Sequence, residues 1–329
     1  MLLGLAVAAA AVVGAGLAFA PRAASASLDT GVVDVTTNLA YQNGSAAGTG
    51  MVLTSSGDVL TNNHVIRGAT TVRVVDPSTG RSYAATVVGY SVSSDIALLK
   101  IRGASHLRTV TLGDSSAVRV GQRVTAIGNA GGAGGKPSSA TGTVTGLGRT
   151  IVASDGGGLS ERLVGLIRTN AALEPGDSGG PLLNTAGRVI GIDTAASAGF
   201  QFQSLHDGYA IPINRALAIV RQIRAGRASA TVHIGSTPFL GLSVAFAPSD
   251  QNGSGAGVAA VVPGSPAAQA GIVAGNTITT LDGQAVTSYA ALTKLLLRHN
   301  AGDTVMLEWV DATGATQSAS VRTAAGPPQ

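Results

Sequence analysis

The chain has 329 residues, more than one ordinary hydrophobic core accommodates, which predicts about two domains. Apolar residues make up 45% of the sequence and charged residues 12%, a composition that excludes an intrinsically disordered chain. The net charge is +4 with no basic run interleaved with aromatic residues, and cysteine is absent, so the sequence argues against nucleic-acid binding and excludes disulfides and thiol catalysis.

Residues 1–20 form a continuous apolar stretch that ends at Pro21. Ala24-Ser25-Ala26 follows with the small residues that surround a signal-peptidase site. We therefore expect a signal peptide over residues 1–26 and an exported protein, either secreted or held in the cell envelope. The stretch is also long enough to span a membrane, so an uncleaved anchor is the alternative.

A first domain is expected over residues 27–226. From Val32 to Ile213 the sequence consists of short β-rich runs separated by Gly, Asn, Asp and Ser, a pattern that predicts an all-β barrel or sandwich. Apolar residues then recur at helical spacing over residues 214–224, with Asn214 as the expected N-cap.

A linker is expected over residues 227–237, followed by a second domain over residues 238–323. Strand-like runs in this domain accompany two predicted helices. The first begins behind Ser265 with Pro266 in its first turn, and the second begins at Ser288. This pattern indicates a small α+β domain. The tail, residues 324–329, is expected to be disordered.

The segment Gly176–Pro181 places a serine, Ser178, between glycines. Glycines permit a tight exposed turn and allow backbone N–H groups to converge on one point, as a developing oxyanion requires. A serine hydroxyl is a weak nucleophile alone and needs a base and an orienting acid. His64 and Asp95 stand in polar islands at the edges of upstream strands, and the order His, Asp, Ser is that of chymotrypsin-type proteases.

The three residues have distinct predicted roles. Ser178 would attack a carbonyl, His64 would take and later return the proton, and Asp95 would orient the imidazole. The amides of Gly176 and Ser178 would form the oxyanion hole. Each residue alone has a structural explanation, but together they favour a catalytic triad. No histidines stand at metal-ligand spacing, so we expect neither a metal nor a cofactor.

Several motifs of the first domain occur together in one known family. They are Gly48–Gly50, Thr61–Val65, Asp95–Ile101, Ala126–Asn129, Pro175–Pro181, Gly187–Thr194 and Gly208–Pro212. With them the domain resembles the trypsin-like part of the HtrA (DegP/DegQ-like) serine proteases, and more narrowly the secreted PepA-type members of actinobacteria. The resemblance implies a mainly β fold with a chymotrypsin-like double β-barrel.

The second domain resembles the PDZ domain that follows the protease in this family. Phe239, Leu240, Gly241 and Leu242 look like its carboxylate-binding loop. PDZ domains bind a peptide C-terminus as an added strand. Here the groove would lie between the strand from Leu240 and the helix near Leu296. The alternative is that Phe239 to Leu242 is merely an apolar strand that enters a core.

The resemblance also bounds the specificity of the enzyme. Ala172, Leu173 and Ile192 would line the primary specificity pocket, which predicts cleavage after small or medium apolar residues. Asp177 departs from the Asn that most HtrA proteases carry before the nucleophile, and the sequence identifies no partner for it. Family trimers use aromatic residues near the N-terminus, where residues 27–50 offer only Tyr41, so the sequence leaves a homo-oligomer open.

The sequence therefore predicts an exported serine endopeptidase acting on unfolded or damaged proteins, with peptide C-termini recruited at the PDZ groove. The rival hypothesis is a chaperone or peptide-binding protein whose triad is held in a resting state. An esterase that uses the same triad is a weaker alternative, because a peptide-binding domain suits a protease better.

Overall fold

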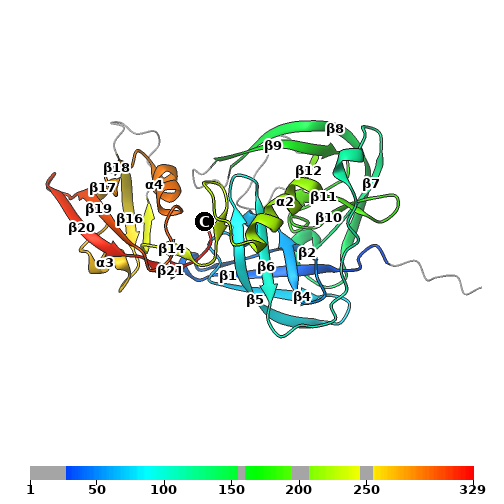
Figure 1. The fold of residues 1–329 in the computed structure, drawn as a ribbon, viewed down its shortest axis with the longest axis horizontal. Coiled ribbons are helices and arrows are strands. Elements are labelled where there is room, and N and C mark those ends of the chain that lie inside the picture. The colour runs from blue at the N-terminus through cyan, green and yellow to red at the C-terminus, as the bar shows by residue number, and fades with distance from the viewer. Residues whose placement is uncertain (1–26, 155–159, 195–206, 245–254) are drawn as a thin grey trace, which may run out of the picture.

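The computed structural model describes residues 27–154, 160–194, 207–244 and 255–329. These residues form a mainly β molecule, with two β-barrels beside a smaller α+β domain (Figure 1). The predicted signal peptide, residues 1–26, lies outside the described residues. Within them, no helix combines the length and the apolar character that crossing a membrane demands.

The first barrel consists of strands paired in the order β5-β4-β1-β2-β3-β6, and it closes because β5 also pairs with β6. Its Val, Leu and Ile side chains fill one core cluster together with Tyr90. The strands are β1 (Val32–Leu39), β2 (Gly44–Val52), β3 (Asp58–Thr61), β4 (Thr71–Asp76), β5 (Arg81–Ser91) and β6 (Ile96–Ile101). Two short helices, η1 (Ala40–Gln42) and α1 (Asn63–Ile66), follow β1 and β3.

The second barrel is closed in the order β10-β11-β12-β9-β8-β7. Its strands are β7 (Arg123–Gly128), β8 (Ser138–Ser154), β9 (Ser160–Thr169), β10 (Pro181–Asn184), β11 (Val189–Thr194) and β12 (Gly208–Pro212). The short helix η2 (Ser115–Ala117) precedes β7, and η3 (Ala130–Gly132) follows it. A core cluster shared by both barrels and helix α2 (Ile213–Arg224) joins the two halves.

Helix α2 begins differently from the prediction. Pro212 occupies the N-cap position, and the Asn214 side chain instead donates to the Asp114 carboxylate at 2.6 Å. The prediction of Asn214 as the cap was wrong because a nearby carboxylate offered its amide a tertiary partner. The helix therefore anchors the chain that leads into the second barrel.

The α+β domain contains β15 (Leu242–Val244), β16 (Ala256–Val261), β17 (Thr277–Leu281), β18 (Gln284–Ala285), β19 (Thr304–Val310) and β20 (Thr316–Arg322). Its helices are α3 (Pro266–Gln269) and α4 (Tyr289–Leu296). The predicted Ser265 cap is confirmed, since Ser265 accepts from the Ala268 N–H. Ser288, predicted as the start of the second helix, is its N-cap and accepts from the Ala291 N–H. Before this domain, β13 (His233–Ile234) pairs with β5 and β14 (Thr237–Phe239) begins.

The tail differs from its predicted disorder. Ala324–Gly326 forms strand β21, which pairs with β14 at the junction between the first barrel and the α+β domain (Figure 1). Beyond it, the Pro328 carbonyl accepts the Gly68 N–H at 2.8 Å, and the Gln329 carbonyl accepts Asn63 Nδ2 at 2.9 Å. The prediction failed because the tail has no periodicity of its own and takes its order from tertiary backbone partners.

Candidate active site

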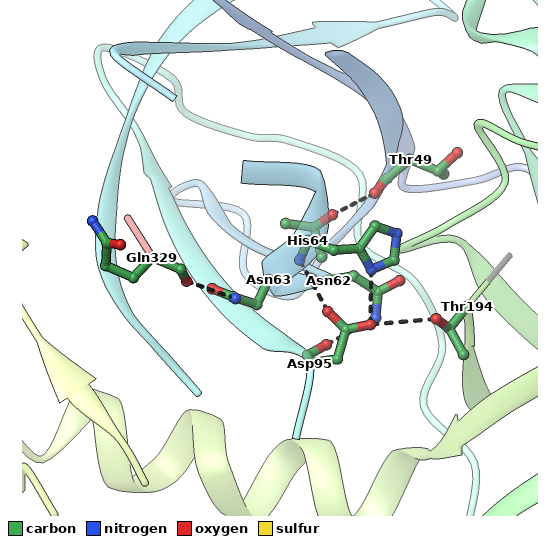
Figure 2. Close-up of polar contacts among 8 residues, drawn as sticks. Thr49, Asn62, Asn63, His64, Asp95, Thr194 and Gln329 are labelled. Carbon is green, nitrogen blue, oxygen red and sulfur yellow. Dashed lines mark hydrogen bonds and ion pairs between the residues drawn. The ribbon is translucent and has the colours of Figure 1, made fainter. Parts of the chain in front are cut away.

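His64 lies on helix α1, and Asp95 precedes strand β6, so the first barrel supplies both residues. The Asp95 carboxylate is 0% exposed and receives three hydrogen bonds (Figure 2). His64 Nδ1 lies 2.9 Å from Oδ2, the His64 backbone N–H donates to Oδ1 at 2.9 Å, and Thr194 Oγ1 donates to Oδ2 at 3.3 Å. These contacts fix the imidazole with Nδ1 toward the carboxylate and Nε2 on the opposite side of the ring, as the predicted base requires.

Asp95 itself adopts a left-handed backbone conformation, with φ of 52°. Aspartate tolerates this region better than most residues with a side chain. Its carbonyl accepts Asn62 Nδ2 at 2.9 Å, which ties the turn to the segment that carries His64 (Figure 2). The predicted base and the predicted orienting acid therefore belong to one hydrogen-bonded unit.

Ser178 lies in the loop between β9 and β10 of the second barrel and is 2% exposed. Its carbonyl accepts the Thr49 N–H from β2 at 2.8 Å. A Cβ at neighbouring Gly48 would lie 3.1 Å from the Ser178 carbonyl oxygen and 2.7 Å from a methyl group of Val65. Because Val65 directly follows His64, Gly48 lies where the backbone of the Ser178 turn comes close to the helix that carries the predicted base.

The predicted oxyanion donor Gly176 has a defined peptide orientation. The Gly131 N–H donates to the Pro175 carbonyl at 2.7 Å, and a trans peptide bond directs the adjoining Gly176 N–H to the opposite side. Gly176 has φ of 102°, and a Cβ there would lie 2.1 Å from the Asn129 carbonyl oxygen, so only glycine fits. Gly176 and His64 line the same groove.

Asp177, whose partner the sequence did not identify, is buried under this turn. Its Oδ2 accepts the Glu174 N–H at 2.9 Å, and Ser138 Oγ lies 3.5 Å from Oδ1. Burial raises the pKa of the carboxyl, the Glu174 hydrogen bond lowers it, and the Glu174 charge raises it further. The partners of Asp177 are thus a backbone amide and a hydroxyl.

A second carboxyl, Asp193, lies beside it; the sequence placed its strand at the specificity pocket but predicted no role for the carboxyl itself. It is 0% exposed, and neither carboxylate oxygen has a hydrogen-bond partner. Burial first, and then the charge of Asp177, raise the pKa of Asp193 well above its usual value. Its backbone holds the serine turn, because its carbonyl accepts the Gly179 N–H and its N–H donates to Gly180. The signal in the sequence was an Asp inside an otherwise buried strand.

The predicted specificity-pocket residues do not gather in one place. Leu173 packs against the core cluster of the second barrel, and a Cβ at Gly208 would touch its side chain at 2.9 Å. Ile192 instead packs in the core cluster between the barrels, and Ala172 is exposed. Side chains alternate along a strand, so Ile192 and its neighbour Asp193 point to opposite faces.

The predicted peptide-binding residues lie along one groove of about 1270 Å³. Its lining includes Phe239, Leu240, Gly241, Leu242 and Leu296. The same groove extends between the domains to His64 and Gly176. Leu240 is at the same time a member of the α+β domain's core, so the loop both enters the core and borders the groove.

Tyr41, the aromatic residue considered for trimer contacts, stacks on Phe239 within the same chain. The two ring centroids are 5.2 Å apart. This contact connects the short helix η1 to the predicted carboxylate-binding loop. Within the described residues, no group of three potential metal ligands occurs.

Fold and site together define a trypsin-like serine protease joined to a PDZ domain. Residues 48–192 match the trypsin-like peptidase domain family, and residues 199–322 match the PDZ domain family. The solved structure of the HtrA-type protease AlgW with a tripeptide is similar with a TM-score of 0.51 and 30% identity, over 91% of this chain and 95% of that chain.

Curated relatives agree. The serine protease PepD of Mycobacterium tuberculosis is 35% identical over 88% of this chain and 63% of its own length. The periplasmic serine endoprotease DegP of Escherichia coli is 38% identical over 75% of this chain and 50% of its own. The chain thus spans about half to two thirds of these relatives. It belongs to the HtrA family of serine endopeptidases with a PDZ domain.

Proposed function

We propose that this protein is an exported endopeptidase that cleaves unfolded or damaged proteins. The observation that carries the proposal is the hydrogen bond between His64 and the buried Asp95, with His64 bordering the same groove as Gly176. Residues 27–226 would form the catalytic domain and residues 238–323 the PDZ domain. The export signal would be residues 1–26, in line with the periplasmic location named for the DegP relatives.

The catalytic cycle follows from where the proton can go. Ser178 Oγ would attack the scissile carbonyl carbon as His64 Nε2 takes the hydroxyl proton, so that a C–O bond forms and the carbonyl electron pair moves to oxygen. Asp95 stabilises the imidazolium through the Nδ1 contact at 2.9 Å. Return of the proton to the amine breaks the C–N bond, and water then hydrolyses the acyl-enzyme by the same proton route.

The negative oxygen of the intermediate would be received by the N–H groups of Gly176 and Ser178. Loss of one such donor raises a barrier by about 3–4 kcal/mol. Leu173 supports a preference for small or medium apolar residues before the cut, since it brings an apolar side chain to Gly208. Its neighbour Ala172 adds no charge.

The PDZ domain would recruit peptide C-termini. A peptide would add to β15 as an extra strand, with its terminal carboxylate at the loop from Phe239 to Gly241 and its side chains toward Leu296. Gly241 has φ of 78°, and a Cβ there would lie 2.1 Å from the Ser265 side chain, so the loop needs glycine at this point. Solved AlgW structures hold a tripeptide or a decapeptide.

Incubation of the mature protein with unfolded casein tests this function, with Ser178→Ala as the control. We expect fragments from the wild type alone, because removal of the nucleophile leaves only the residual catalysis of the binding groups. Mass spectrometry of the fragments should show Ala, Val, Leu or Ile before the cuts. Cuts after Arg or Lys would contradict the pocket assignment. Suppression of casein aggregation by both proteins, without fragments, would establish the chaperone hypothesis instead.

A further inference from the structure

The Gly48-Thr49-Gly50 motif on β2 has no part in the proton transfers described above. Both glycines are explained by close packing, since a Cβ at Gly48 would touch Val65 and one at Gly50 would lie 2.8 Å from Val59. Thr49 between them is 0% exposed. A polar residue buried between two tightly packed glycines requires hydrogen-bond partners.

Thr49 finds those partners on three separate segments. Its hydroxyl accepts the Asn129 N–H at 2.9 Å and donates to the Gly176 carbonyl at 2.7 Å. Its backbone N–H donates to the Ser178 carbonyl at 2.8 Å, and its carbonyl accepts Thr61 Oγ1 at 2.7 Å. One residue of the first barrel therefore holds both sides of the serine turn in the second barrel.

The consequence concerns the two peptide planes that meet at Gly176. The bond from Gly131 orients the peptide before Gly176, and the Thr49 hydroxyl orients the peptide after it. A glycine can exchange between backbone conformations that other residues cannot reach, so its neighbours must hold it. The Thr49 side chain suits this task, because its β-branch restricts χ1 and its hydroxyl already has both a donor and an acceptor partner.

The Asn129 contact extends the same restraint to the glycine-rich loop of residues 129–135, which follows β7. Besides binding Thr49, Asn129 accepts the Gly132 N–H on its carbonyl at 2.8 Å and the Gly134 N–H on Oδ1 at 2.7 Å. This is the loop that supplies the Gly131 N–H to Pro175. The Thr49 hydroxyl thus contacts both the Gly176 carbonyl and the loop whose Gly131 N–H holds the Pro175 carbonyl.

We propose that Thr49 is a positioning residue of the oxyanion hole: by holding the Gly176 carbonyl and the Asn129 N–H, its hydroxyl keeps the Gly176 backbone in the conformation that directs its N–H to the negatively charged oxygen. The proposal rests on the proposed protease function of the same site. Thr49 touches neither the substrate nor the reacting atoms and acts through Gly176 and Asn129.

The test compares Thr49→Val, which keeps the shape and removes the hydroxyl, with Thr49→Ser, which keeps the hydroxyl. Thr323→Val is the matched control, because the Thr323 hydroxyl is also buried and bridges backbone groups of Gly302, Asn300 and Asp303, far from the serine turn. For a peptide substrate, we expect Thr49→Val to lower kcat about 10- to 100-fold with KM within twofold, since the oxyanion contact acts in the transition state. Thr49→Ser should keep kcat within about threefold of the wild type.

A second measurement needs no turnover. Hydrogen exchange of peptides covering residues 174–180 should be faster in Thr49→Val than in the wild type and in Thr323→Val. A lowered Tm with unchanged kcat and unchanged exchange of this segment would overturn the proposal and leave Thr49 a structural residue. An inactive wild type would overturn the proposed function, and the exchange result would then decide the positioning role by itself.

Discussion

The two barrels contribute to the site in different ways. The first barrel holds His64 and Asp95 in a network in which the carboxylate has three donors. The second barrel presents the Ser178 turn above Asp177 and Asp193, two buried carboxyls whose pKa values are both raised. Buried carboxyls without full partners destabilise a fold and are found most often at functional sites. The carboxylate beside His64 is thus fully hydrogen-bonded, whereas the Ser178 turn lies beside two carboxyls whose buried charge is poorly compensated.

The largest expected effect comes from changing the carboxylate that contacts His64. In Asp95→Asn, the amide oxygen would take the place that accepts the His64 backbone N–H, leaving the NH₂ group toward Nδ1. The NH₂ donor favours the wrong imidazole tautomer, and we expect kcat to fall about 10⁴-fold with little change in stability. Steady-state kinetics on a peptide substrate measure it. A loss below tenfold would show that Asp95 does not orient the base.

The second prediction concerns how the buried Asp193 carboxyl beside the Ser178 turn changes stability with pH. Well below the ordinary Asp pKa of about 3.9, Asp193 is protonated in the folded and the unfolded chain alike, so it adds no pH dependence there. As the pH rises, the unfolded chain releases the proton while the folded chain, with its raised pKa, retains it. The wild type therefore loses stability relative to Asp193→Asn, by up to about 1.4 kcal/mol per pH unit, until the pH reaches the raised pKa.

Thermal unfolding of both proteins between pH 4.5 and pH 8 measures this difference, where the Tm advantage of Asp193→Asn should grow with pH. Asp311→Asn provides a control of opposite sign. Hydrogen bonds from Thr313 and Gln317 lower the pKa of Asp311 to about 2, so this carboxylate stabilises the fold at neutral pH and less as the pH falls. A constant Tm difference for Asp193→Asn would show that the carboxyl is not held protonated.

The same contrast explains what the sequence could predict. The sequence alone was enough to propose His64, Asp95 and Ser178 as site residues, because each stands in a local motif whose chemistry requires that residue type. The roles of Thr49 and Asp193 were not, because they depend on which atoms of one barrel meet the other. Ile192 was assigned to the pocket although the strand alternation directs it into the core between the barrels. The pairing of β10 and β11 shifts register between Leu182 and Leu183, and no pattern in the sequence predicts this shift.

The smallest expected effect concerns the C-terminal tail, residues 324–329, which contacts the first barrel next to His64. Asn63, which precedes His64, donates to the Gln329 carbonyl at 2.9 Å (Figure 2), and Tyr90 and Tyr289 contact Gln329 at 3.4 Å. Asn63→Ala removes one hydrogen bond, which lowers stability by about 1 kcal/mol. Because the Asp95 contacts fix His64 independently of Gln329, we expect casein cleavage within twofold of the wild type.

Hydrogen exchange should locate the change produced by Asn63→Ala in residues 324–329. Tyr289→Phe is the matched variant, because it removes the contact to Gln329 from the α4 side and leaves α1 untouched. If the tail only docks, both variants accelerate exchange there and neither changes kcat. A tenfold fall of kcat in Asn63→Ala, absent from Tyr289→Phe, would mean that the orientation of His64 depends on Asn63. The hydrogen bonds to Asp95 would then not be sufficient to fix the imidazole.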